Sequence, residues 1–322
     1  MKILVTGAAG FIGSKLMAFL RERGDEVVGI DNFNDYYDVR LKEARTAFFG
    51  LDVRRVDLAD KASVDALFAQ ERFDKVVNLA AQAGVRYSIS HPYAYLESNL
   101  VGFFNILEAC RHHDVKHLVY ASSSSVYGLN TEVPYREEDK TDSPVSLYAA
   151  TKKSNELMAH AYCKLYGIAM TGLRFFTVYG PWGRPDMSPM LFAKAITRGE
   201  AIKVFNHGDM IRDFTYIDDI VEGTAACIDR IPAADVHGLP FRVYNIGCSH
   251  PVRLMEFISE MEQALGVEAR KEFLPMQPGD VYQTNADTTL LERETGYRPR
   301  VLLHEGIGRF VEWYRSERNP LK

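Results

Sequence analysis

A tyrosine, a lysine and a run of serines are the residues of this sequence best suited to chemistry. Tyr148 and Lys152 stand four residues apart, so on a helix their side chains lie on one face. A lysine ammonium beside a phenol favours the phenolate and lowers the pKa of the tyrosine. The run from Ser122 to Ser125 can bring a hydroxyl to the same substrate oxygen. Together these groups could remove a proton from an alcohol while a cofactor takes the hydride.

Alternating strands and helices position these groups. Apolar runs suited to buried parallel strands alternate with helical patterns near 11–23, 61–71, 93–112 and 146–166, and Pro92 and Pro144 stand at or near helix starts. This alternation predicts an α/β fold with a Rossmann-like, doubly wound parallel sheet. The predicted strands are Ile3–Thr6, Glu26–Ile30, Val53–Val56, Val76–Leu79, Leu118–Ala121 and Ala169–Leu173.

A second, smaller lobe is expected in the later part of the chain. After Arg174 the sequence FFTVYGPWGRPDMSP is rich in Gly, Pro and aromatic residues, which is typical of a loop that forms a site. The segments TYIDDIVEGTAACI and RVYNIG indicate a helix and a strand that return to the sheet. We therefore expect a cofactor domain over 1–175 joined by 214–250, and a mixed α/β substrate lobe over 176–213 and 251–322.

Composition excludes several classes of function. The net charge of −5 and the pI of about 6.0 argue against nucleic-acid or acidic-membrane partners. No apolar run approaches the roughly 20 residues of a membrane span. The first predicted strand begins so early that it leaves no room for a signal peptide, which indicates a cytoplasmic protein. The four cysteines form no CxxC pair and the histidines no HExxH motif, so no metal is expected.

A glycine-rich turn follows the first predicted strand and opens a helix. Gly7, Gly10 and Gly13 let the turn close, let backbone N–H groups approach a pyrophosphate and let the helix pack on the strand. Asp31 ends the second strand eighteen residues after Gly13. An acid at this position accepts the ribose hydroxyls of a dinucleotide and repels a 2′-phosphate, which favours NAD over NADP.

These features resemble the extended short-chain dehydrogenase/reductase family over essentially the whole chain. The resemblance lies in GxxGxxG, Asp57-Leu58, NLAAQAG at 78–84, Asn99 and YxxxK. It implies that Tyr148 is the base and that Lys152 holds the phenolate and the nicotinamide ribose; for Leu58 and Ala80, plain core packing is the alternative. The implied NAD-binding residues are Gly7, Gly10, Phe11, Ile12, Gly13, Asp31, Asn32, Asp57, Leu58, Leu79, Ala80, Ala81, Gln82, Asn99, Tyr148, Lys152 and Phe175.

The serine run indicates the class of reaction. In the family the catalytic Ser or Thr stands four residues before the tyrosine of VYG, which selects Ser123, whereas Ser122 is expected to be structural. Family members that eliminate water carry Asp-Glu at the next two positions, and uronate decarboxylases carry Ser-Glu. This chain has Ser124-Ser125. Without the extra carboxylate, the chemistry is expected to stop at oxidation and re-reduction of one carbon, which describes an epimerase.

Further segments resemble the UDP-glucuronate 4-epimerases within that family, namely NFNDYYDVRLKEAR, AAQAGVRYSI, RFFTVYGPWGRPDMSP and QPGDVYQTNAD. The resemblance implies interconversion of UDP-glucuronate and UDP-galacturonate through a 4-keto sugar. The substrate carboxylate would contact Thr177, Ser124 and Ser125, next to Tyr148 and Ser123. Arg184 and Arg86 are candidate anion-binding residues; the alternative for Arg184 is a solvated loop arginine.

Arg212 resembles the arginine that holds the UDP pyrophosphate, and Asp280 would reach the uridine ribose or a partner arginine. The alternative for Arg212 is an ion pair with Asp213 or Asp218. Galactose-type epimerases carry an arginine three residues before the aspartate, where this chain has Gln277. Either the pyrophosphate site is one charge weaker here, or another residue supplies that charge.

Three alternative functions are considered for the same residues, and the family likeness also implies a homodimer. A UDP-glucuronate decarboxylase is disfavoured by Ser125, another nucleotide-sugar 4-epimerase by the Thr177 loop, and a non-catalytic NAD-binding regulator by the intact Ser123, Tyr148 and Lys152. By family likeness, the helices at 93–112 and 146–166 would pair across a two-fold axis in a homodimer.

Overall fold

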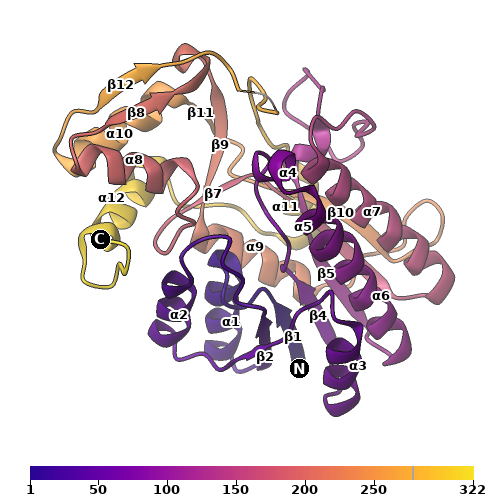
Figure 1. The fold of residues 1–322 in the computed structure, drawn as a ribbon. Coiled ribbons are helices and arrows are strands. Elements are labelled where there is room, and N and C mark those ends of the chain that lie inside the picture. The colour runs from indigo at the N-terminus through magenta and orange to yellow at the C-terminus, as the bar shows by residue number, and fades with distance from the viewer. Residues whose placement is uncertain (278) are drawn as a thin grey trace.

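A seven-stranded parallel sheet forms the centre of the protein, whose computed structural model describes residues 1–277 and 279–322. The strand order is β10-β6-β5-β4-β1-β2-β3, in which the connection from β3 to β4 crosses over β2 and β1, as is typical of a doubly wound fold (Figure 1). The predicted fold class is confirmed. The strands are β1 (Lys2–Thr6), β2 (Glu26–Asp31), β3 (Val53–Arg55), β4 (Lys75–Asn78), β5 (His117–Ser123), β6 (Ala169–Phe175) and β10 (Phe241–Ile246).

Helices cover both faces of this sheet because its strands are apolar on both sides. Ile3 and Val5 of β1 point into one buried core, and Leu4 between them points into the other. The first core contains residues of α1 (Phe11–Glu22), α2 (Val39–Phe48) and α9 (Ile217–Asp229). The second contains residues of α3 (Lys61–Gln70), α6 (Gly102–His112) and α7 (Leu147–Tyr166).

The predicted helix near 93–112 is built from several pieces. Two single turns, α4 (Tyr87–Ser90) and α5 (Pro92–Tyr95), lead into a π-helical segment, Leu96–Val101, and then into α6. Pro92 occupies the first turn of α5, as predicted. The π-helical segment carries the buried Asn99, and such segments are frequent near functional sites.

In the later part of the chain, β10 joins the large sheet and α9 packs against it, as the sequence predicts. The same part of the chain forms two small sheets. One has the order β11-β9-β7 and the other pairs β12 with β8. The expected boundary at 213–214 falls inside β9. The strands are β7 (Thr177–Tyr179), β8 (Ala201–Val204), β9 (Ile211–Tyr216), β11 (Pro251–Arg253) and β12 (Arg270–Phe273), and the helices are α8 (Ser188–Thr197), α10 (Leu254–Leu265), α11 (Thr289–Thr295) and α12 (Leu303–Arg315).

Within residues 1–277 and 279–322, no helix has the length and apolar character needed to cross a membrane. The same residues contain no group of three or more His, Cys, Asp or Glu side chains arranged to hold a metal ion. The cytoplasmic location stays a prediction.

Candidate active site

A cavity of about 1280 Å³ lies at the carboxyl ends of the central strands and extends toward the small sheets. Gly7 follows β1, Asp31 ends β2, and the serine run closes β5, so the strands deliver these residues to one edge. Of the residues predicted to bind cofactor or substrate, all line the cavity except Asn99. The Asn99 side chain instead exchanges two hydrogen bonds with the backbone of Gln82, at 2.8 and 3.1 Å.

The glycine-rich turn is too tightly packed for side chains. Gly7 has a φ of +68°, and a Cβ there would lie 2.9 Å from the backbone nitrogen of Ala80. A Cβ on Gly13 would overlap the carbonyl oxygen of Gly7. Gly10 precedes α1 without a side-chain cap, so the first N–H groups of the helix remain available to an anion. The turn therefore offers a bare backbone surface to a pyrophosphate.

Asp31 is held in place at the end of β2. It is buried, and its carboxylate accepts a 2.7 Å hydrogen bond from the backbone N–H of Phe33. The ammonium of Lys42 lies 3.3 Å from the same oxygen and donates to the side chain of Asn34 at 3.0 Å. Lys42 is buried and lines the cavity. Sequence reasoning missed Lys42, because a lysine in a polar segment gives no signal that it is buried.

The Tyr148–Lys152 pair lies on α7 beside the end of β5. Lys152 is only 3% exposed, its ammonium donates to the carbonyl of Ala121 at 2.8 Å, and burial lowers its pKa to about 8. Burial raises the pKa of Tyr148, against which the hydroxyl of Ser123 and the charge of Arg184 act in the lowering direction. The sequence-based expectation of a lowered tyrosine pKa was therefore wrong for the free protein, because desolvation outweighs the nearby donors and charge.

Three residues of the serine run differ in their hydrogen bonds. The hydroxyl of Ser122 donates to the buried Glu156 at 2.7 Å. Glu156 in turn forms a buried two-contact ion pair with Arg174, at 2.8 and 2.9 Å, which fixes the end of β5 against β6. Ser123 accepts hydrogen bonds from the backbone and the hydroxyl of Ser125, at 3.1 and 2.9 Å. These contacts agree with a structural role for Ser122.

Two arginines and an aspartate line the cavity near the small sheets. Arg86 forms a 3.0 Å ion pair with Asp280, and its guanidinium lies 4.9 Å from the ring centre of Phe205. Arg212 donates to the carbonyls of residues 281 and 282 at 2.7 and 3.0 Å. The alternative pairing of Arg212 with Asp213 or Asp218 was wrong. Asp213 accepts from the backbone amides of residues 248, 249 and 286, and Asp218 pairs with Lys15 at 3.1 Å.

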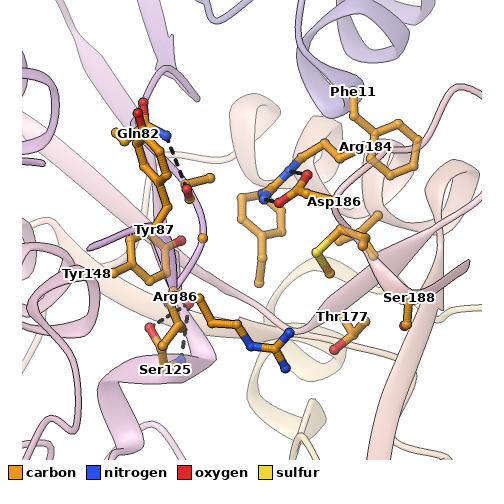
Figure 2. Close-up of a pocket in the computed structure, with 18 of the residues that line it drawn as sticks. Phe11, Gln82, Arg86, Tyr87, Ser125, Tyr148, Thr177, Arg184, Asp186 and Ser188 are labelled. Carbon is orange, nitrogen blue, oxygen red and sulfur yellow. Dashed lines mark hydrogen bonds and ion pairs between the residues drawn. The ribbon is translucent and has the colours of Figure 1, made fainter. Parts of the chain in front are cut away.

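Figure 2 shows Tyr148 and Ser125 on one side of the cavity, with Thr177, Arg184 and Asp186 facing them. Arg184 forms a two-contact ion pair with Asp186, at 3.0 and 2.5 Å. The sequence-based alternative of a solvated loop arginine does not describe Arg184, since its side chain is 22% exposed and paired.

The buried Arg45 of α2 connects the glycine-rich turn with the loop that carries Arg184. Its guanidinium is fully buried and donates to the carbonyl of Trp182 at 2.7 and 3.0 Å, and to that of Ala9 at 3.2 Å. Ala9 belongs to the glycine-rich turn, whereas Trp182, with a φ of +67°, precedes Arg184 by two residues. Arg45 therefore fixes the loop that carries Arg184 relative to the turn. The sequence motif that contains Arg45 gave no sign of this role.

The fold and the cavity together define a dinucleotide-binding enzyme, and comparison with known proteins gives its family. The chain belongs to the NAD dependent epimerase/dehydratase family, since the sequence model of that family matches residues 3–247. This confirms the family resemblance seen in the sequence.

The chain is also similar to individual proteins with known substrates. The chain is 48% identical to UDP-glucuronate 4-epimerase 4 of Arabidopsis thaliana, covering 98% of this chain and 75% of the plant protein. It is similar to the crystal structure of UDP-glucuronic acid 4-epimerase from Bacillus cereus in complex with UDP-glucuronic acid and NAD, with a TM-score of 0.88, 35% identity, and 97% and 98% coverage of the two chains. The UDP-glucose 4-epimerase of Thermus thermophilus in complex with NAD gives a TM-score of 0.87 at 31% identity, with 98% and 100% coverage. Backbone similarity alone therefore does not decide between a uronate and a neutral hexose.

Proposed function

We propose that this protein is an NAD-dependent UDP-glucuronate 4-epimerase, which inverts C4 of UDP-glucuronate to give UDP-galacturonate and keeps the carboxylate. The observation that carries this proposal is the composition of one cavity: it combines Tyr148 and Lys152 with the neutral hydroxyls of Ser124, Ser125 and Thr177. The 48% identity to a plant UDP-glucuronate 4-epimerase supports the same substrate.

The residues of the cofactor half fit NAD. The bare glycine turn and the uncapped start of α1 suit a pyrophosphate, and Asp31 with Lys42 beside it suits the adenosine ribose. Lys152 lies where it can hold the second ribose. We assign residues 1–175 and 214–250 to NAD, and 176–213 with 251–322 to the nucleotide sugar. Bound there, NAD would supply the acceptor for the C4 hydride and the donor that returns it to the opposite face of the 4-keto sugar.

The chain's own residues then handle the proton and hold the substrate. Tyr148 takes the C4 hydroxyl proton, with Ser123 as hydrogen-bonding neighbour. Because burial raises the pKa of Tyr148, positive charge near the phenol is required, and Arg184 already acts in that direction. Ser124, Ser125 and Thr177 hold the C5 carboxylate as neutral donors. Held in this way, the carboxylate stays in a geometry that resists loss of carbon dioxide, and position 125 carries no acid that could protonate the enolate left by such a loss.

The proposed activity is tested by incubating the purified protein with UDP-glucuronate without added cofactor and following the sugar by NMR. Inversion at C4 with UDP-galacturonate as product supports the proposal. A UDP-pentose as main product would instead indicate a decarboxylase. Faster turnover of UDP-glucose than of UDP-glucuronate would indicate an epimerase of neutral hexoses.

Arg86 supplies, in this proposal, the second pyrophosphate charge that Gln277 lacks. It reaches the substrate end through its ion pair with Asp280, and Arg212 lines the same region. Arg86→Gln is expected to raise the KM for UDP-glucuronate and the Ki of UDP about tenfold, with kcat little changed, because the pyrophosphate is held equally before and during the reaction. Arg136→Gln, an exposed arginine paired with Asp287, is the matched control. A fall in kcat without a change in the Ki of UDP would contradict this role.

A homodimer is proposed from the exposed apolar side chains of two adjacent helices. Val101, the last residue of the π-helical segment, and Phe104 of α6 are 47% and 44% exposed, and Leu157 and Leu165 of α7 are 60% and 68% exposed. Their spacings of three and eight residues place them on one face of each helix. Figure 1 shows α6 and α7 side by side at the edge of the molecule. Such a face suits the predicted two-fold pairing.

The dimer proposal predicts that a charge on this face separates the subunits. Phe104→Glu combined with Leu157→Glu is expected to give a monomer in sedimentation velocity, where the native protein sediments as a dimer. Val236→Glu, which adds the same charge at a 95% exposed position between α9 and β10, should leave the mass unchanged. A native protein that sediments as a monomer at micromolar concentration would overturn the proposal.

A further inference from the structure

Three side chains from two segments meet over the cavity at the Arg184 loop. The carboxylate of Asp186 accepts two contacts from Arg184 and a 2.9 Å hydrogen bond from the hydroxyl of Tyr36. The Arg184 guanidinium also lies 5.9 Å from the centre of the Tyr36 ring. Tyr36 stands 150 residues before Asp186 in the sequence, so the contact ties the segment after β2 to the loop before α8. All three residues line the cavity.

The site around Tyr36 is sterically defined. The Tyr36 ring packs on Tyr87 with 4.7 Å between ring centres. Gly84 has a φ of +98°, and a Cβ there would lie 2.6 Å from the Tyr36 hydroxyl and 3.7 Å from a terminal nitrogen of Arg184. A side chain at position 84 would therefore displace Tyr36. This packing fixes the donor that holds Asp186 in place.

The charges of the pair cancel in the free protein. Although burial acts in the opposite direction, the Arg184 guanidinium holds the pKa of Asp186 below its usual value, with help from Tyr36. Asp186 is therefore ionised at neutral pH and occupies Arg184 by two contacts. A second carboxylate that approaches Arg184 must compete with Asp186, and the negative charge of Asp186 also opposes its approach.

We propose that Asp186, anchored by Tyr36, is the counter-ion that sets how strongly Arg184 binds the carboxylate of a uronate sugar. This inference rests on the proposed function, since it concerns the same sugar site. A neutral UDP-hexose offers no anion, so Arg184 stays with Asp186. A uronate exchanges with Asp186, and the exchange keeps the carboxylate from being held too tightly while the keto sugar turns and the product leaves. Asp186 is thus a positioning residue that acts through Arg184.

The test compares dissociation constants of UDP-glucuronate and UDP-glucose, measured by calorimetry on NAD-loaded protein in a Tyr148→Phe background that prevents turnover. Asp186→Asn is expected to lower the dissociation constant of UDP-glucuronate about fivefold, the size expected for a partly exposed ion pair. The dissociation constant of UDP-glucose should change less than about twofold. Tyr36→Phe should act in the same direction with a smaller effect. Arg184→Gln should weaken UDP-glucuronate alone.

The matched control is Asp35→Asn, which removes the same charge from an exposed position beside Tyr36 and should leave both constants unchanged. A loss of affinity for both sugars in Asp186→Asn, or no change in their ratio, overturns the counter-ion role. Failure of the proposed function is a separate result. The wild-type protein could make no UDP-galacturonate while Asp186→Asn still lowers the dissociation constant of UDP-glucuronate selectively. That result would support the counter-ion role of Asp186 and overturn the proposed activity.

Discussion

Tyr148→Phe is expected to lower kcat for UDP-glucuronate epimerisation about a thousandfold while the protein keeps its NAD. The substitution removes only the phenolic oxygen, and positioned acid–base groups contribute roughly 10² to 10⁴ to enzymatic rates. The ring packing survives, because the edge-to-face contact of Tyr148 with Tyr95, 6.0 Å between centres, does not involve the hydroxyl. Product formation by NMR and the NAD released on denaturation measure the two quantities.

The control for this variant is Tyr166→Phe, which removes a hydroxyl from the last residue of the same helix, far from the cavity lining. Its kcat should equal that of the native protein. If Tyr148→Phe retains kcat within about tenfold of the native value, Tyr148 does not carry out the proton transfer. If neither the native protein nor Tyr148→Phe turns over sugar and both bind NAD, the non-catalytic regulator is favoured.

The sequence predicts the central sheet well because its strands are buried on both faces and read as continuous apolar runs. Helix α2 gives no such signal. Its buried residues are Leu41, Lys42 and Arg45, so the side that faces inward is largely cationic and apolar periodicity fails. Asp38, which caps the helix by accepting from the backbone N–H of Arg40 at 3.0 Å, is the one local sign of its start. The small strand β12 is similarly polar and was not predicted.

The residues of the candidate site follow from motifs, whereas their partners do not. Arg86 and Asp280 were both noted in the sequence, but they are 194 residues apart and only the fold pairs them. Tyr36 and Asp186 were not singled out in the sequence, and the fold brings them together across 150 residues. The pKa of Tyr148 depends on how deeply the phenol is buried, which local sequence does not contain. Motifs thus indicate which groups take part, and tertiary packing sets their charges.

Lys152 shows this dependence most clearly, because the fold loses stability by burying it. Its pKa falls from 10.5 to about 8, which corresponds to a penalty of about 3 kcal/mol for the charged form. The folded pKa lies below the unfolded one, so between these values the unfolded chain binds more protons and stability rises with pH. Below about pH 8 the whole penalty is present. The hydrogen bond to Ala121 offsets only part of it.

Lys152→Met is therefore expected to separate activity from stability. We expect kcat to fall at least about a hundredfold, since the ammonium that supports the phenolate and the cofactor ribose is gone. The free energy of unfolding of the cofactor-free protein at pH 7 should rise by about 1–2 kcal/mol: the charge penalty disappears, while the carbonyl of Ala121 loses its donor at a cost of about 1–2 kcal/mol. Urea denaturation at pH 7 and pH 9.5 measures this gain, which should shrink at the higher pH.

Lys164→Met, at an exposed position on the same helix, is the matched control and should change the unfolding free energy by less than about 0.5 kcal/mol. If Lys152→Met lowers stability at both pH values, Lys152 contributes to the fold and its burial is no sign of function. If stability rises while turnover is lost, the fold retains a destabilising charge that only the reaction requires. In that case the buried lysine identifies the catalytic site on energetic grounds, independently of the YxxxK motif.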